Sequence, residues 1–380
     1  MRKLFAISFL AFLSACGGKE PVSSEKKNIL QNLTYSVDTV VVDAGSGLID
    51  LRYGILKSDI SSDQKFLYRL QPSSAVFTVI DLDQLKLVSQ QTLAKEGPNA
   101  VPNMPQTLKV LNEQEMFLHG FETTGVYSLE GEKLKDLRIS MDGYQNTDRI
   151  SKYSISYALT PSFENQKLYS LPINDSSKVT SFAVSSLVDL KGKVISLPEF
   201  EPLSKFSLTY KEGNSYSGAN AGSIVLYVED GRTIIHSYAT NSLYIYLPET
   251  DSLIYRSYQV ELAPNSKKIP VTNDFTSLDD FRRVAKETSE DISYGKIFKD
   301  GKSNQYYRFG SIVKPKSSEE EETKNDVYLF AFDQDLNLIG EKSLSSLNSQ
   351  PYDAFFKDGK LYSYVNVEDE LGFAVFTFDF

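Results

Sequence analysis

A recurrent tight turn, followed each time by an aromatic-rich strand, most constrains what this chain can fold into. At six sites an acidic or amide residue precedes Gln or Gly, and the next residue is basic in five of the six. These turns begin at residues 63, 113, 165, 230, 300 and 358, so they are 50, 52, 65, 70 and 58 residues apart. Asp-Gly pairs favour hairpin turns because glycine adopts positive φ without a clash. We therefore predict one hairpin-based unit about every 60 residues.

A second turn follows each of the first five, again between short runs that alternate apolar and polar residues. One unit then contains a strand, a tight turn, a strand, a variable loop, a strand, a second tight turn and a strand. Four antiparallel strands repeated in this way are typical of a β-propeller blade. An irregular all-β sandwich is the alternative, although its turns do not usually recur in pairs. We predict an all-β fold, a six-bladed β-propeller of four-stranded antiparallel blades.

The last unit is incomplete, because the chain stops within the alternating run LGFAVFTFDF (371–380). This run aligns with the third strand of the other units, so the sixth unit lacks a fourth strand. The segment YSVDTVVVDAG (35–45) is a strand without a partner at the other end of the chain. A strand edge left open would expose unpaired N–H and C=O groups. We therefore predict that the N-terminal strand completes the last blade.

The N-terminus has the features of an export signal. A basic start precedes the apolar run LFAISFLAFL (4–13), and LSAC (13–16) follows, with Cys16 the only cysteine of the chain. LSAC resembles the lipobox of bacterial lipoproteins; an ordinary secretory signal that contains a cysteine is the alternative. The resemblance implies a signal peptide at 1–15 and an acylated Cys16, carrying lipid such as palmitate. A flexible spacer to residue 31 and a single propeller domain at 32–380 would follow.

With this lipobox and architecture, the chain resembles the six-bladed β-propeller lipoproteins of Bacteroidetes-type bacteria, many of them grouped only as a family of unknown function. The resemblance implies no catalytic residue. Gly17 rather than Asp follows Cys16, which in lipoprotein sorting implies a lipid anchor in the outer membrane, on the periplasmic side or at the cell surface. Cleavage removes Arg2 and Lys3 and changes the formal net charge from −10 to −12, which argues against nucleic acid as a partner.

Candidate ligand-binding residues lie in the long loops predicted between the blades, among them residues 140–153, 198–222 and 261–293. The loop at 140–153 combines Tyr144, Asn146 and Arg149, which suit a polar ligand, although any polar loop has this composition. A helix is predicted near 276–287, with Ser277 as its N-cap. Its neighbouring cations would contact an anionic ligand at the mouth of the central funnel; the alternative is two solvated arginines. These cations are Arg282 and Arg283.

No pattern of catalytic or metal-binding residues is recognisable. The chain lacks a G-x-S-x-G elbow and a Walker loop, and its two histidines, His119 and His236, fall in different units. We expect no catalytic residue, no metal site and no cofactor. The sequence favours a lipid-anchored binding or scaffold protein of the cell envelope that recognises a protein or glycan through its loop-rich face. The alternative is a carboxylate-based hydrolase acting on glycans, marked by a pair of carboxylates in the central funnel.

Overall fold

The computed structural model describes residues 28–152, 154–174, 178–213, 215–229, 231–316, 318 and 321–379. The predicted lipidation site, Cys16, and the signal peptide lie outside these residues. Strands dominate the described part, which holds a single α-helix, and most strands form four-stranded antiparallel sheets. The predicted all-β class is therefore confirmed.

The first three of six main sheets follow one another along the chain. Sheet 1 contains β2 (Ser58–Ile60), β3 (Phe66–Leu70), β4 (Val76–Asp81) and β5 (Lys86–Thr92). Sheet 2 contains β6 (Pro105–Val110), β7 (Glu115–Gly120), β8 (Thr124–Ser128) and β9 (Lys133–Asp136). Sheet 3 contains β11 (Thr160–Ser162), β12 (Lys167–Ser170), β13 (Ser181–Ser186) and β14 (Gly192–Ser196).

Three further sheets complete the molecule. Sheet 4 contains β17 (Ile224–Glu229), β18 (Arg232–Ser237), β19 (Leu243–Leu247) and β20 (Ser252–Arg256). Sheet 5 contains β22 (Ser293–Asp300), β23 (Gln305–Val313), β24 (Asn325–Phe332) and β25 (Leu338–Ser343). Sheet 6 contains β26 (Ala354–Lys357), β27 (Lys360–Val367), β28 (Glu370–Asp379) and β1 (Thr34–Val41).

The predicted pairing of the two ends of the chain is confirmed. β1 lies antiparallel to β28, in a register that runs from Thr34 opposite Asp379 to Val41 opposite Gly372. The order of sheet 6 is β1-β28-β27-β26, so the N-terminal strand occupies the fourth position that the sixth unit lacks. β1 thereby satisfies the outer edge of β28.

Glycine allows the Asp-Gly turns to close tightly. Gly231 and Gly359 adopt φ of +80° and +79°, a region in which a Cβ atom would be strained. At the corresponding turns without glycine, Gln64 and Gln166 take φ of +60° and +51°. Four of the six turns therefore share this geometry in spite of different sequences, whereas Gln114 and Gly301 do not have a positive φ.

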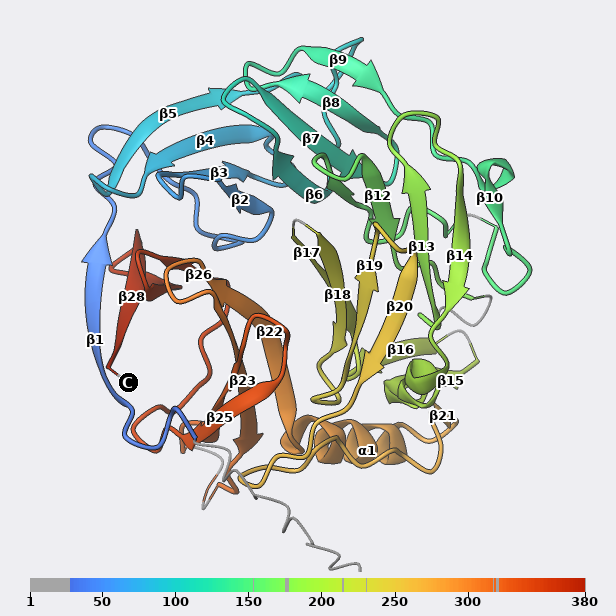
Figure 1. Cartoon of the computed structure of the whole chain (residues 1–380), viewed down its shortest axis with the longest axis vertical. Helices are drawn as coiled ribbons and strands as arrows, with labels where there is room; N and C mark the ends of the chain where they lie inside the picture. The colour runs from blue at the N-terminus through green and yellow to red at the C-terminus, as the bar shows by residue number, and fades with distance from the viewer. Residues whose placement is uncertain are drawn as a thin grey trace, which may run out of the picture.

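Each main sheet packs against the next, and sheet 6 packs against sheet 1 (Figure 1). Six clusters of buried apolar side chains make these joins. Phe182 of sheet 3 lies against Tyr246 of sheet 4 with ring centroids 5.2 Å apart, and Tyr307 of sheet 5 lies 5.3 Å from Phe356 of sheet 6. In order from the join of sheets 1 and 2, the clusters include Phe77 and Met116, Phe117 and Leu168, Phe182 and Tyr246, Ile245 and Phe330, Tyr307 and Phe356, and Phe373 and Leu67.

The first strand of each sheet faces a common centre. There β2, β6, β11, β17, β22 and β26 line a cavity of about 660 Å³, named here the central cavity. In five of the sheets, a buried polar side chain of the second strand donates to a backbone carbonyl in the first strand or in the loop before it. The bonds run from Arg69 to Gly54 (2.7 Å), Ser170 to Ile155 (2.6 Å), Ser237 to Gly222 (3.0 Å), Arg308 to Gly295 (3.0 Å) and Ser363 to Tyr352 (2.9 Å).

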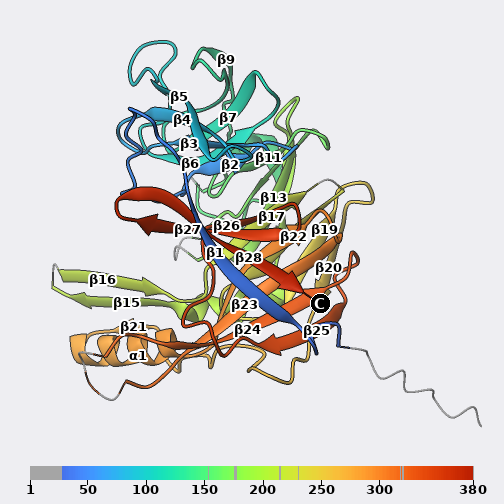
Figure 2. The same cartoon turned by 90° about the vertical axis from the view of Figure 1, so that its left-hand side faces the viewer.

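Two segments predicted as loops, 198–222 and 261–293, instead contain strands as well as the predicted helix. They form an accessory layer that projects from the main sheets (Figure 2). It comprises β15 (Ser207–Glu212), β16 (Ser215–Asn220), β21 (Asp274–Phe275) and α1 (Leu278–Glu290). The 3-10 helix η2 (Pro198–Phe206) precedes β15 and packs into the apolar cluster that joins sheets 3 and 4. β15 pairs with β16 as a hairpin and with β21 in parallel. Leu208, Tyr210, Phe275 and Phe281 form its small apolar core.

The predicted loop 140–153 is also partly structured. It forms the short 3-10 helix η1 (Met141–Gly143) and the edge strand β10 (Tyr144–Gln145), which pairs in parallel with β14 of sheet 3. The loop interpretation was wrong at these residues, because two residues of strand carry no alternating pattern that a sequence can display.

Candidate functional site: a groove beside the accessory helix

The predicted helix forms as α1, and its boundaries follow from capping. Ser277 has extended backbone angles, φ −104° and ψ 125°, and its Oγ accepts a hydrogen bond from the Asp280 N–H at 3.3 Å. Asp279 and Asp280 place negative charge in the first turn, where the helix dipole favours it. Phe281 is buried in the accessory core. The predicted helix and its N-cap at Ser277 are confirmed.

A buried lysine holds the other end of α1. Lys267 is only 3% exposed, and its Nζ donates to the carbonyl oxygens of Thr288 at 2.8 Å and Asp291 at 3.3 Å. These are carbonyls that the helix leaves without a partner, and a cation suits the negative end of the dipole. Burial lowers the pKa of Lys267 to about 8. The segment before the helix is thereby fastened to its last turn.

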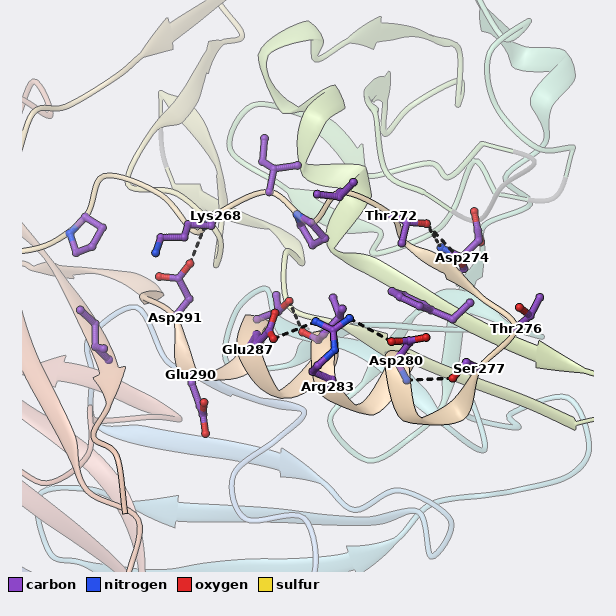
Figure 3. A pocket seen from close by; sticks show the side chains of 18 residues that line it. Lys268, Thr272, Asp274, Thr276, Ser277, Asp280, Arg283, Glu287, Glu290 and Asp291 are labelled. Carbon is purple, nitrogen blue, oxygen red and sulfur yellow. Dashed lines mark hydrogen bonds and ion pairs between the residues drawn. The ribbon is translucent and has the colours of Figure 1, made fainter. Parts of the chain in front are cut away.

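Between α1 and the segment 268–277 lies a groove of about 1090 Å³, called the α1 groove (Figure 3). Phe275 and Val284 contribute apolar surface, and their side chains also belong to or pack on the accessory core. Ile269 and Val271 are 48% and 99% exposed. The groove therefore combines apolar contact surface with ready access from solvent.

The α1 groove is acidic. Five carboxylates and two cations line it, namely Asp274, Asp280, Glu287, Glu290, Asp291, Lys268 and Arg283. Arg283 donates to Asp280 at 3.2 Å and to Glu287 at 3.1 Å, as the dashed lines of Figure 3 mark. The hydrogen bond to Asp280 raises the pKa of the Arg283 guanidinium. Its charge is thus already balanced within the helix, and the lining keeps an excess of three negative charges.

The structure does not bring the candidate residues together into one site. Arg283 lines the α1 groove, whereas Arg282 is exposed and lines neither this groove nor the central cavity. Tyr144 is buried against sheet 3, where its hydroxyl donates to Ser185 Oγ at 2.7 Å, so its ring is not accessible to a ligand. Asn146 and Arg149 are exposed beyond β10.

Both histidines are buried, His119 in sheet 2 and His236 in sheet 4. Burial lowers the pKa of His119 to about 4 and the pKa of His236 well below its ordinary value. His119 Nδ1 lies 2.7 Å from Thr124 Oγ1, and His236 Nδ1 lies 3.4 Å from the Arg308 guanidinium. Within the described residues, no three His, Cys, Asp or Glu side chains form a group that could hold a metal ion.

Sequence reasoning missed Lys267, Val271 and the lysines of the central cavity. Lys267 and Val271 lie in a loop with no periodicity, so nothing marks one as buried and the other as exposed. The cavity lysines had a weak signal, because they lie in or beside the first strand of a unit, as in ILKSD, TLKVL and YGKIFK.

Fold and groove together define an all-β protein of four-stranded antiparallel sheets, with an accessory layer that carries an acidic groove. Its sequence matches, over residues 26–343, the family described as a domain of unknown function, DUF4221, and the chain belongs to this family. The resemblance to a family of unknown function is therefore confirmed. No curated protein matches the chain significantly. In the described residues, no helix has the length and apolar character needed to cross a membrane.

Two solved structures from Bacteroides share the fold. One is a DUF4221 family member from Bacteroides vulgatus, with 15% identity and a TM-score of 0.62, covering 91% of this chain and 98% of the other. The second is a putative exported protein from Bacteroides fragilis, with 11% identity and a TM-score of 0.50, covering 91% of this chain and 95% of the other. At these identities the likeness extends to the fold alone.

Proposed function

We propose that this protein is a lipid-anchored, non-catalytic binding protein of the cell envelope, built on a six-bladed β-propeller. Its α1 groove would hold a protein partner with a basic and apolar contact segment. The observation that carries this proposal is the acidic groove of about 1090 Å³ on the projecting accessory layer. A groove that is open, acidic and partly apolar suits recognition of a chain segment of opposite charge.

The propeller assignment is supported by packing. Six antiparallel sheets each join the next through a buried cluster, and sheet 6 joins sheet 1. The N-terminal strand completes sheet 6, which is how an antiparallel architecture avoids an open edge. The six sheets would then be the six blades.

The lipid anchor is supported by the sequence LSAC at residues 13–16 and by the single cysteine. A structurally similar chain from Bacteroides fragilis is a putative exported protein. Several acyl chains on Cys16 would hold the protein at the outer membrane, on the periplasmic side or at the cell surface. Labelling with a palmitate analogue should mark the wild type and not Cys16→Ala, and the variant should leave the membrane fraction.

Site-directed photocrosslinking in native membranes tests the groove. A benzophenone amino acid at Val271, which is 99% exposed in the groove, should give one adduct of defined mass. The same group at Val188, which is 72% exposed outside the groove, is the control. The adduct should weaken when Glu290→Lys reverses one charge of the lining. Equal adducts at both positions, or insensitivity to Glu290→Lys, would overturn the proposal.

The alternative of a carboxylate-based glycan hydrolase has less support. Such an enzyme needs one carboxylic acid with a raised pKa close to a second carboxylate. Two aspartates line the central cavity, and each is ion-paired, Asp59 with Lys109 at 2.7 Å and Asp353 with Lys296 at 3.3 Å. The charged partner of each aspartate is thus an ammonium group and not the second carboxylate that this mechanism requires.

A further inference from the structure

The central cavity has the opposite charge to the α1 groove. Four lysines and two aspartates line it, namely Lys57, Lys109, Lys296, Lys299, Asp59 and Asp353. The lining thus has an excess of two positive charges in a chain whose formal net charge is −10. Positive charge concentrated in a cavity attracts anions more strongly than the same charge on an open surface.

One of the four lysines has no acidic partner. Lys109 pairs with Asp59, Lys296 with Asp353, and Lys299 with Glu229 at 3.1 Å. In the described part of the chain Lys57 forms no ion pair; its Nζ donates to the Gln106 carbonyl at 2.9 Å. An ammonium has three donors, so this side chain can still hydrogen-bond an anion.

Lys57 also lies close enough to a second cation to be affected by it. Burial and then the Lys296 ammonium lower the pKa of Lys57, whereas Asp353 raises it. Three charged groups, two positive and one negative, therefore act on one another at this end of the cavity. A bound anion would relieve the repulsion between the two ammonium groups.

The backbone that presents these groups is held in an unfavourable conformation. Lys57 and Asp353 precede β2 and β26, with φ of +58° and +43°. The buried Arg69 and Ser363 bind carbonyls in the same two loops, at Gly54 and Tyr352. Positive φ at residues other than glycine is costly and is commonly kept where a site must be preorganised.

A smaller cavity of about 280 Å³ extends this end, since Lys296 and Asp353 line both hollows. It adds Tyr238 and Tyr352, the latter 60% exposed. It also adds the Oε1 atom of Gln350, which is buried and has no hydrogen-bond partner. Aromatic faces and a free acceptor suit the apolar face and the hydroxyl donors of a sugar ring.

We propose that the central cavity binds an anionic sugar, with its oxyanion between Lys57 and Lys296 and its ring beside Tyr352 and Gln350. A uronate and a sugar phosphate share this chemistry. A volume of about 660 Å³ lies within the range of small-molecule pockets. This sugar site is separate from the protein-binding site proposed at the α1 groove. The α1 groove has no lining residue in common with the central cavity or with the smaller cavity beside it.

Calorimetric titration of the full-length protein in detergent tests the site with three probes: galacturonate, glucose 6-phosphate and glucose. At low salt at least one anionic sugar should bind at least tenfold more tightly than glucose. Preference for galacturonate identifies a carboxylate ligand, and preference for glucose 6-phosphate identifies a phosphate ligand. If neither anion binds more tightly than glucose, the proposal is wrong.

Three variants define the roles of the charged groups. Lys57→Gln should weaken binding of the preferred probe at least tenfold, whereas Lys86→Gln, on the outer strand β5 of the same sheet, should not change it. Asp353→Asn should tighten binding severalfold, because Lys296 loses its competing carboxylate and asparagine tolerates positive φ. A purely structural role of Asp353 would weaken binding instead. Loss of binding in Asp353→Asn with an unchanged unfolding midpoint would overturn the proposal.

Discussion

The six main sheets and the accessory layer differ in how they are supported. Each main sheet packs on two neighbours through buried clusters, and the chain ends are tied together in sheet 6. The accessory layer has one small core of Leu208, Tyr210, Phe275 and Phe281 and is attached through two connecting segments. Damage to the main sheets should therefore spread through the molecule, whereas damage to the accessory layer should stay local.

Removal of the closing strand should have the largest effect. Deletion of residues 34–41 exposes the edge of β28 and disrupts the packing of Leu30 and Leu33, which are 0% and 5% exposed. The deletion removes the eight residue pairs between β1 and β28 and the backbone hydrogen bonds that join them. Each such bond contributes about 0.5–1.5 kcal/mol net, so the free energy of unfolding should fall by roughly 5 kcal/mol or more. Urea unfolding followed by circular dichroism measures the change.

Shortening the β15–β16 hairpin by residues 211–216 is the matched control for that deletion. It removes a hairpin tip that projects from the molecule, so the main unfolding transition should keep its midpoint and its slope (Figure 2). Equal destabilisation by the two deletions would show that the main sheets do not depend on β1.

Two phenylalanines allow the same comparison with single substitutions. Phe182 is 0% exposed between Tyr169 and Tyr246 at the join of sheets 3 and 4, so Phe182→Ala should cost about 3–5 kcal/mol of global stability. Phe281→Ala removes a ring that is 8% exposed in the accessory core. It should accelerate hydrogen exchange in α1 while the global midpoint stays nearly unchanged. A global loss from Phe281→Ala equal to that from Phe182→Ala would contradict local support.

The contrast also explains what could be predicted from the sequence. The turns and the Ser277 cap are local signals, each contained in a short stretch of sequence. The pairing of β1 with β28 joins the two ends of the chain, and it was predictable because the repeat left one strand without a partner at each end. The pairing of Thr209 with Asp274 joins residues far apart in sequence. Because β21 is only two residues long, it has no alternating pattern from which the strand could be predicted.

The candidate sites were harder to predict for the same reason. Tyr144 stands in a polar stretch, and its burial depends on Ile150, Ala183 and Val194, which reach it only in the folded sheet 3. The positive charge of the central cavity arises when Lys57, Lys109 and Lys296, from three separate units, meet at the centre. Such a charge has no signature within one unit.

The stability of the accessory layer should also depend on pH through Lys267. Burial lowers the pKa of this lysine to about 8, so between that pH and about 10.5 the unfolded chain binds more protons than the folded one. The contribution of Lys267 to folding should thus become more favourable by about 2 kcal/mol from pH 7 to pH 9.5. The free energy of opening of α1, measured by hydrogen exchange in the wild type relative to Lys267→Met at each pH, should rise over this range. If the difference between wild type and Lys267→Met does not change with pH, burial does not lower the pKa of Lys267.

The smallest effect on stability, and the sharpest on the groove, is expected from Arg283→Ala. Both of its ion pairs are exposed, so α1 should lose less than about 1 kcal/mol. The excess negative charge of the lining should rise from three to four, so crosslinking of a basic partner from Val271 should become faster at low salt and return to the wild-type rate at high salt. Arg282→Ala is the matched control, since Arg282 is exposed on the same helix outside the groove. An equal gain in both variants would mean that the charge of the whole layer, and not the groove, attracts the partner.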